Sequence, residues 1–147
     1  MRQDLRSFVE AYAAAYPGEV IWVAEPVGLE FDLQAIALEL ERRRRFPILL
    51  FESVVGHDIP VICNVMASRR ALAFALGVEE ARLPVEYAGR LKDYIDPAVV
   101  EDPPFRHTVL TGERVDLSKL PIPTYFPGDG GPYITAGMTV AKDPETG

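Results

Sequence analysis

Cysteine, histidine and long apolar runs are scarce in this sequence, and each scarcity excludes a class of protein. Cys63 is the single cysteine among 147 residues, so the chain can form neither an internal disulfide nor a cysteine-based metal site. The two histidines, His57 and His107, have no neighbours with metal-ligand spacing. A membrane-spanning helix needs about 20 apolar residues, whereas the longest uninterrupted apolar runs here are short, such as residues 20–24. Because MRQDLRSF also lacks the features of a secretory signal, we expect a cytoplasmic protein with no membrane span.

Positively charged residues are also fewer than negatively charged ones, with 15 Lys and Arg against 22 Asp and Glu. The formal net charge is −7 at pH 7, and an acidic chain repels phosphate backbones, which disfavours nucleic-acid binding. One run, Arg42 to Arg45, departs from this balance. It follows a helical pattern, and cations at the C-terminal end of a helix offset its negative dipole. A helix-ending role is therefore favoured, with anion binding as the alternative.

What the chain does have is the apolar content and patterning of a soluble globular domain. It is 48% hydrophobic and 25% charged. Apolar periodicity, caps and breakers predict helices at residues 5–16, 32–45, 69–76 and 84–95, with caps at Asp4, Asp32 and Ser68, a closing Gly77 and a first-turn Pro84. Runs rich in β-branched and aromatic residues predict strands at 19–25, 47–54, 61–65, 107–112 and 133–142.

These elements predict an α+β (mixed α/β) fold: a layered domain with a small mixed sheet flanked by about four helices. Residues 47–54 and 61–65 are expected to pair as a hairpin. Proline and glycine accumulate over residues 120–132, which makes this stretch the candidate domain boundary.

Motifs for independent catalysis are missing. The serines at 7, 53, 68 and 118 lie in no nucleophile elbow. Glu113 and Asp116 fit a solvated turn as well as they fit an acid–base pair. The loop PGDGGPYITAG, residues 127–137, lacks the spacing of a calcium loop or of a phosphate loop. Composition and spacing therefore indicate only a soluble acidic α/β-type domain.

Three stretches, in order, resemble the UbiD family of decarboxylases, which use prenylated FMN. They are DLRSFVEAY near the start, FPILLFESVVGHDIPVICNVMASRRALAFALG at 46–77, and HTVLTGERVDLSKLPIPTYFPGDGGPYITAGMTVAKDPETG at 107–147. The resemblance implies an N-terminal α/β domain, a central split β-barrel that holds the flavin, and a C-terminal assembly domain. It divides this chain into an α/β domain at 1–119, a crossing at 120–132, and the start of a truncated flavin-binding split barrel, with its first strand, at 133–147.

The family resemblance also implies a reaction. It is the reversible decarboxylation of aromatic or α,β-unsaturated carboxylic acids, through a covalent adduct with prenylated FMN. A divalent metal (Mn or Mg) and K+ hold the cofactor phosphate, and the full-length enzyme is expected to be a homo-oligomer. Ile134, Thr135 and Ala136 would lie nearest the flavin, although threonine and isoleucine are also ordinary strand formers.

The sequence departs from the family by stopping after DPETG. The family's Asn, His and Glu metal ligands and its Glu-Arg-Glu network follow that point, so no catalytic or metal residue is assigned, and Asn64 is not the ligand asparagine. We expect the chain alone to be an inactive fragment with no cofactor bound. The alternative is a stand-alone, non-catalytic α/β domain that binds a partner protein chain. Such a domain would pair residues 133–142 within its own sheet.

Overall fold

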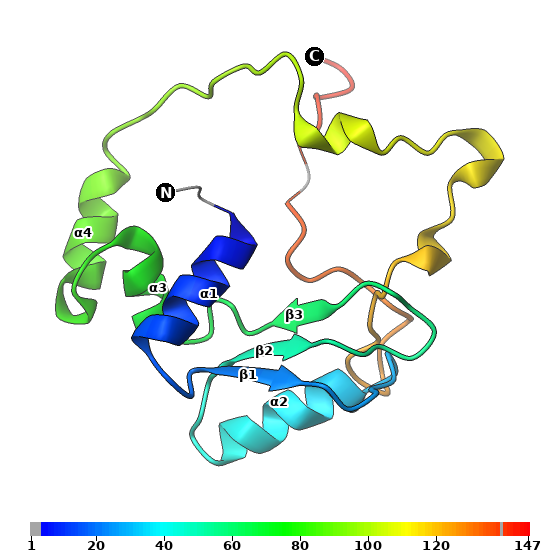
Figure 1. Ribbon diagram of the computed structural model, residues 1–147. Helices are drawn as coiled ribbons and strands as arrows, with labels where there is room; N and C mark the ends of the chain where they lie inside the picture. Colours follow the sequence, from blue (N-terminus) through cyan, green and yellow to red (C-terminus); the bar gives the residue numbers. More distant parts are fainter. Residues whose placement is uncertain (1–3, 139) are drawn as a thin grey trace.

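The computed structural model describes residues 4–138 and 140–147, and within them the mixed α/β architecture is confirmed (Figure 1). The α-helices and strands are α1 (Leu5–Ala15), β1 (Val20–Val23), α2 (Asp32–Arg42), β2 (Ile48–Phe51), β3 (Val61–Cys63), α3 (Arg69–Leu76) and α4 (Leu83–Arg90). Short 3-10 turns follow at Glu80–Arg82, Pro104–His107, Gly112–Arg114 and Leu117–Lys119.

The three strands form one mixed sheet in the order β1-β2-β3. β1 and β2 are parallel, with Val20 opposite Ile48, and α2 makes the crossover that a parallel pair requires. β2 and β3 are antiparallel, with Leu49 opposite Cys63, which confirms the predicted hairpin.

Helices cover both faces of this sheet (Figure 1). Leu49 and Phe51 are fully buried and pack with Leu33 of α2. Ile48, whose side chain points to the opposite face, packs instead with Tyr12 of α1. The period-two alternation of one short strand therefore builds two separate hydrophobic cores, one under each helix.

Most helix ends agree with their sequence signals. Asp4 caps α1, Ser68 caps α3, and Gly77 ends α3 with a left-handed φ of 65°. The prediction that Asp32 caps α2 is wrong. Phe31 holds the cap position with a left-handed φ of 71°, and Asp32 is the first helical residue. The Asp32 carboxylate instead accepts the Gly28 backbone N–H at 2.9 Å, which stabilises the turn leading into the helix.

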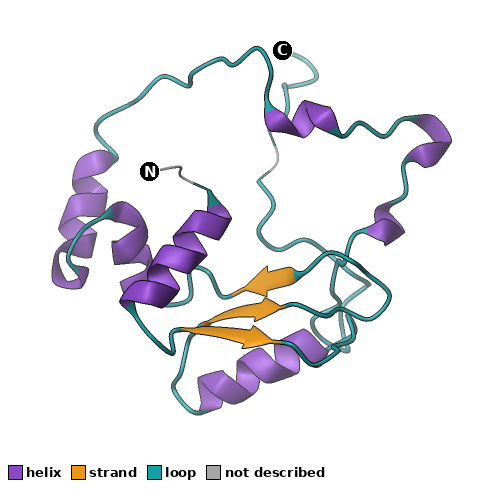
Figure 2. Cartoon of the chain, in the orientation of Figure 1, coloured by secondary structure: helices purple, strands orange, loops and turns teal. Residues whose placement is uncertain are grey.

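Two helices are shorter than expected, and two predicted strands are not formed. α2 ends at Arg42 and α4 at Arg90, not at 45 and 95. Within 107–112, His107 and Gly112 belong to 3-10 turns and residues 108–111 connect them, while residues 133–138 and 140–142 form no strand (Figure 2). Thr139 lies outside the described residues. A strand is defined by its ladder of hydrogen bonds, and these segments have no neighbouring strand among the described residues.

The chain beyond α4 buries little of its apolar surface. Val99 is 97% exposed and Met138 is 94% exposed, and several aromatic side chains in the same region are also exposed. Pro103 and Pro123 are the buried residues in the described part of this segment. The segment therefore has no hydrophobic core of its own, in contrast to residues 4–91.

Candidate functional site

The segment that leads into the loop at 127–137 is attached to the connection between β1 and α2. The Thr124 backbone N–H donates to the Leu29 carbonyl oxygen at 3.0 Å, and the Phe31 N–H donates to the Thr124 carbonyl at 3.0 Å. Leu29 and Phe31 lie in the connection from β1 to α2. The α/β domain thus determines where the following loop begins.

Turn chemistry shapes residues 126–133. The Asp129 carboxylate accepts a hydrogen bond from the Phe126 backbone N–H at 2.9 Å, and the Asp129 backbone N–H donates to the Phe126 carbonyl at 3.0 Å. Gly131 has a φ of 150°, a conformation that residues with a Cβ rarely adopt. The Tyr133 N–H then donates to the Pro123 carbonyl at 3.2 Å, which closes the loop on itself. These contacts explain Asp129 and Gly131 of PGDGGP.

Closure of the loop brings two tyrosines together. The rings of Tyr125 and Tyr133 lie 5.1 Å apart between centroids and are tilted by 57°. The Tyr125 hydroxyl lies 3.2 Å from Thr135 Oγ1. Desolvation raises the pKa of Tyr133, and the negative charge and hydrogen bond of Asp129 raise it further. The cluster therefore offers two aromatic faces and hydroxyl groups, with the Asp129 carboxylate beside Tyr133.

The three residues expected near the flavin are exposed in this chain. Ile134 is 64% exposed, and its side chain lies beside Gly137. Thr135 contacts Tyr125, and Ala136 is open to solvent. Contact between these three residues and a cofactor stays a prediction. Sequence reasoning missed Tyr125 and Tyr133, although aromatic residues on both sides of a proline–glycine turn were a usable signal.

The described residues do not by themselves fit a flavin phosphate with its metal ions. Among residues 4–138 and 140–147 there is no group of three or more His, Cys, Asp or Glu side chains arranged to hold a metal. The loop carrying Ile134 to Ala136 is open rather than a cradle. We therefore derive no catalytic step through prenylated FMN from this chain.

The remaining reactive side chains have structural surroundings. Burial raises the pKa of the Cys63 thiol to about 11, so it is a poor nucleophile. His107 Nε2 lies 3.6 Å from an Asp102 carboxylate oxygen, with both side chains well exposed. His57 Nδ1 lies 3.4 Å from the Lys119 carbonyl. The His107–Asp102 contact is an exposed surface pair, and we assign no catalytic role to these side chains.

A bilayer-spanning helix is absent from the described ranges: none of their helices is both long and apolar enough.

Comparison with protein families gives two matches that together cover most of the chain. Residues 13–91 match the N-terminal domain of UbiD, 3-octaprenyl-4-hydroxybenzoate carboxy-lyase. Residues 98–147 match the Rift-related domain of the same carboxy-lyase family. The first match alone spans more than half of the 147 residues.

Solved structures with the same fold include UbiD-class enzymes. HmfF from Pelotomaculum thermopropionicum, in an evolved dimeric form in complex with prFMN, is 29% identical with a TM-score of 0.82, covering 99% of this chain and 34% of that chain. The apo 3,4-dihydroxybenzoic acid decarboxylase from Enterobacter cloacae is 28% identical with a TM-score of 0.70, covering 89% of this chain and 29% of that chain.

A curated relative, described as an uncharacterized protein in the cooM 5′ region of Rhodospirillum rubrum, is 39% identical over 134 residues. That match covers 88% of this chain and 28% of the relative. The chain thus spans about a third or less of the proteins it resembles. With both family matches in order and the fold shared, the chain belongs to the UbiD family and represents its N-terminal region.

Proposed function

We propose that this chain is the N-terminal part of a decarboxylase that acts reversibly on aromatic or α,β-unsaturated carboxylic acids with prenylated FMN. The observation that carries the proposal is the match to the prFMN complex of HmfF, which extends over 99% of the chain at a TM-score of 0.82. A match of this extent includes the α/β domain and the loop at 127–137 together, not the domain alone.

In this proposal the chain supplies a scaffold and one wall of the flavin site. The bonds from Thr124 to Leu29 and Phe31 set the position of the loop. Ile134, Thr135 and Ala136 then contact the cofactor, and the Tyr125 hydroxyl orients Thr135. We retain the division into an α/β domain at 1–119, a crossing at 120–132 and the start of the flavin domain at 133–147.

Two features of the described residues support a part of a larger enzyme over a self-contained binding domain. Residues 133–138 and 140–142 do not join the β1-β2-β3 sheet. The apolar side chains after α4, such as Val99 and Val140, are exposed in a way that is typical of surfaces covered by another layer. The metal, the K+ ion and homo-oligomeric assembly then belong to the full-length enzyme, and the isolated chain is inactive.

A domain exchange tests this function. This chain would replace the matching N-terminal 29% of the Enterobacter cloacae decarboxylase, and release of CO2 from 3,4-dihydroxybenzoic acid would be measured. Retained activity, with none from the isolated chain, is the expected result. A folded exchange protein that holds flavin but shows no turnover would contradict the proposed role. An exchange of the same length with an unrelated α/β domain is the matched control.

A further inference from the structure

The arginine run at the end of α2 divides into two pairs with different surroundings. Arg42 and Arg43 form ion pairs with Glu39, at 3.7 and 2.7 Å, as expected for the end of a helix. Arg44 and Arg45 lie beyond the helix and line a pocket of about 440 Å3. The helix-ending interpretation therefore accounts for only the first pair.

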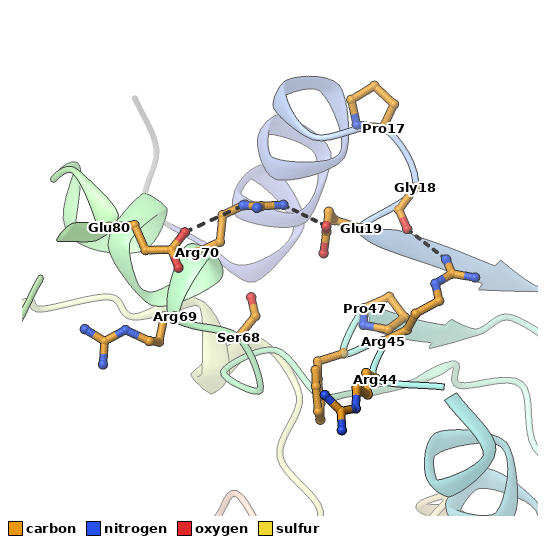
Figure 3. A pocket seen from close by; sticks show the side chains of 11 residues that line it. Pro17, Gly18, Glu19, Arg44, Arg45, Pro47, Ser68, Arg69, Arg70 and Glu80 are labelled. Atoms are coloured by element: carbon orange, nitrogen blue, oxygen red, sulfur yellow. Dashed lines mark hydrogen bonds and ion pairs between the residues drawn. The ribbon is translucent and has the colours of Figure 1, made fainter. Parts of the chain in front are cut away.

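This arginine pocket is built where three connections meet at one end of the sheet (Figure 3). Gly18 and Glu19 precede β1, Arg45 and Pro47 precede β2, and Arg70 belongs to α3, which follows β3. Because β3 is antiparallel to β2, its last residue lies at the end where β2 begins. The pocket is therefore at the opposite end of the sheet from the Thr124 attachment and the loop at 127–137.

Carboxylates neutralise only part of the positive charge here. Four arginines line the pocket, at positions 44, 45, 69 and 70, together with Glu19 and Glu80. Arg70 forms ion pairs with both carboxylates, at 2.8 Å from Glu19 and 3.7 Å from Glu80. Its guanidinium also lies 5.4 Å from the centre of the Tyr16 ring.

The other three arginines form no ion pair within the part of the chain that the structure describes. Arg45 Nη2 donates to the Gly18 carbonyl at 3.5 Å, the outer limit of a hydrogen bond. The Arg69 side chain points away from the other labelled side chains (Figure 3), and no hydrogen bond of the Arg44 side chain is seen among the described residues. These long side chains can change rotamer quickly, so a ligand can draw them inward. A positive pocket thus stands out on a chain whose net charge is −7.

Three of these arginines occupy locally unfavourable positions. Arg44 adopts a left-handed φ of 56°, which glycine tolerates better than a residue with a Cβ. Arg69 and Arg70 occupy the first turn of α3, the end at which the helix dipole disfavours cations. A bound anion would offset both the dipole and the repulsion among the guanidinium groups. An unfavourable backbone conformation retained at a cavity is also a common feature of binding sites.

We propose that the arginine pocket binds the phosphate group of a small organic molecule. Guanidinium groups pair with phosphate oxygens through two parallel hydrogen bonds. A volume of about 440 Å3 falls in the range of small-molecule sites and leaves room for more than the phosphate. Pro17, Phe46 and Pro47 supply an apolar wall for the remainder. This site is separate from the proposed decarboxylase chemistry and does not depend on it.

Two-dimensional NMR titration of the 147-residue chain tests the site. The probes are ribose 5-phosphate, inorganic phosphate and ribose. We expect saturable shifts with ribose 5-phosphate, confined to the amides of Gly18, Arg45 and residues 68–70, and none with ribose. Equal affinity for inorganic phosphate would support a phosphate site while removing the organic part of the ligand. Absence of saturable shifts with either phosphate would overturn the proposal, without the need for any variant.

A matched pair of variants tests which arginines act. R45Q/R69Q should weaken ribose 5-phosphate binding about tenfold or more, because charge-assisted hydrogen bonds are lost. R42Q/R43Q removes the same charge from the neighbouring surface and should change the affinity less than about twofold, since only a screened, longer-range charge effect is lost. Equal weakening by both variants would reduce the effect to general charge attraction and overturn the proposal. Circular dichroism checks that both variants fold.

Discussion

The carbonyl oxygen of Thr124 accepts the backbone N–H of Phe31 at 3.0 Å, which ties the proline–glycine loop to the first residue before α2. Phe31 is left-handed at φ 71°, and its N–H is turned away from the helix. Thr124 completes the exchange by donating its own N–H to Leu29. The left-handed residue at the start of α2 is therefore hydrogen-bonded directly to the segment that leads into the loop at 127–137.

Replacing Thr124 with proline should release the loop. Proline lacks the N–H that donates to Leu29, while the α/β cores remain untouched. Hydrogen exchange should then become faster at the Phe31 and Tyr133 amides, with protection in β2 unchanged. T124V keeps both backbone bonds and is the control. Unchanged exchange at Phe31 in T124P would show that the attachment does not hold the loop.

Removing the Ser68 cap should destabilise α3. Ser68 Oγ accepts the Ala71 N–H at 3.0 Å and also lies 3.5 Å from the Tyr12 hydroxyl. S68A should lower the free energy of unfolding by about 1 kcal/mol, the usual cost of losing a cap, as measured by urea denaturation. S68D restores a capping carboxylate and should recover most of the loss. Equal stability of S68A and the parent chain would argue against the cap.

Replacing Asp129 with asparagine should lower the pKa of Tyr133. Desolvation raises that pKa first, and the Asp129 charge raises it further. Asparagine retains an oxygen to accept the Phe126 N–H but carries no charge. NMR titration of 13C-labelled tyrosine should show the shift, and D116N should leave Tyr133 unchanged. A Tyr133 pKa that is the same in D129N and the parent would remove Asp129 from the cluster's electrostatics.

Alkaline pH should destabilise the fold through Cys63. Its folded pKa is about 11, raised by burial above the ordinary thiol value of 9.0. The neutral thiol is favoured in the fold, so its contribution is complete below the unfolded pKa. It is lost as pH rises through about 11, up to roughly 3 kcal/mol in all.

The stability of C63A provides the comparison for that loss. The parent chain should lose more free energy of unfolding than C63A between pH 8 and pH 11, because alanine has no proton to release. Since tyrosines and lysines titrate in the same range, the difference between the two curves is the informative quantity. Parallel curves would show that Cys63 is not desolvated.

The sequence predicted those elements whose signals are local. The cap at Ser68, the left-handed Gly77 and the strand predicted within 47–54 each depend on a few neighbouring residues, and each is found. The predicted strands at 107–112 and 133–142 failed because strand formation depends on a partner, not only on β-branched residues. Phe31 displaced Asp32 from the cap because Thr124, distant in sequence, holds the Phe31 N–H.

The candidate site was less accessible to sequence reasoning. Ile134, Thr135 and Ala136 came from family resemblance and not from any motif with its own chemistry. The Tyr125–Tyr133 contact depends on the turn at Asp129, which residue spacing alone does not specify. The arginine pocket is lined by residues from the segments before β1, before β2 and after β3. Only the segment before β2, which contains Arg42 to Arg45, was visible in the sequence as a charge run.

Flavin absorbance would show whether this chain supplies one part of a flavin site or the whole of it. This chain would be purified alone and in place of the matching N-terminal 34% of HmfF, both from cells that make prenylated FMN. We expect stoichiometric flavin in the exchanged HmfF protein and none in the isolated chain. Stoichiometric flavin on the isolated chain, or a folded exchange protein without flavin, would contradict it.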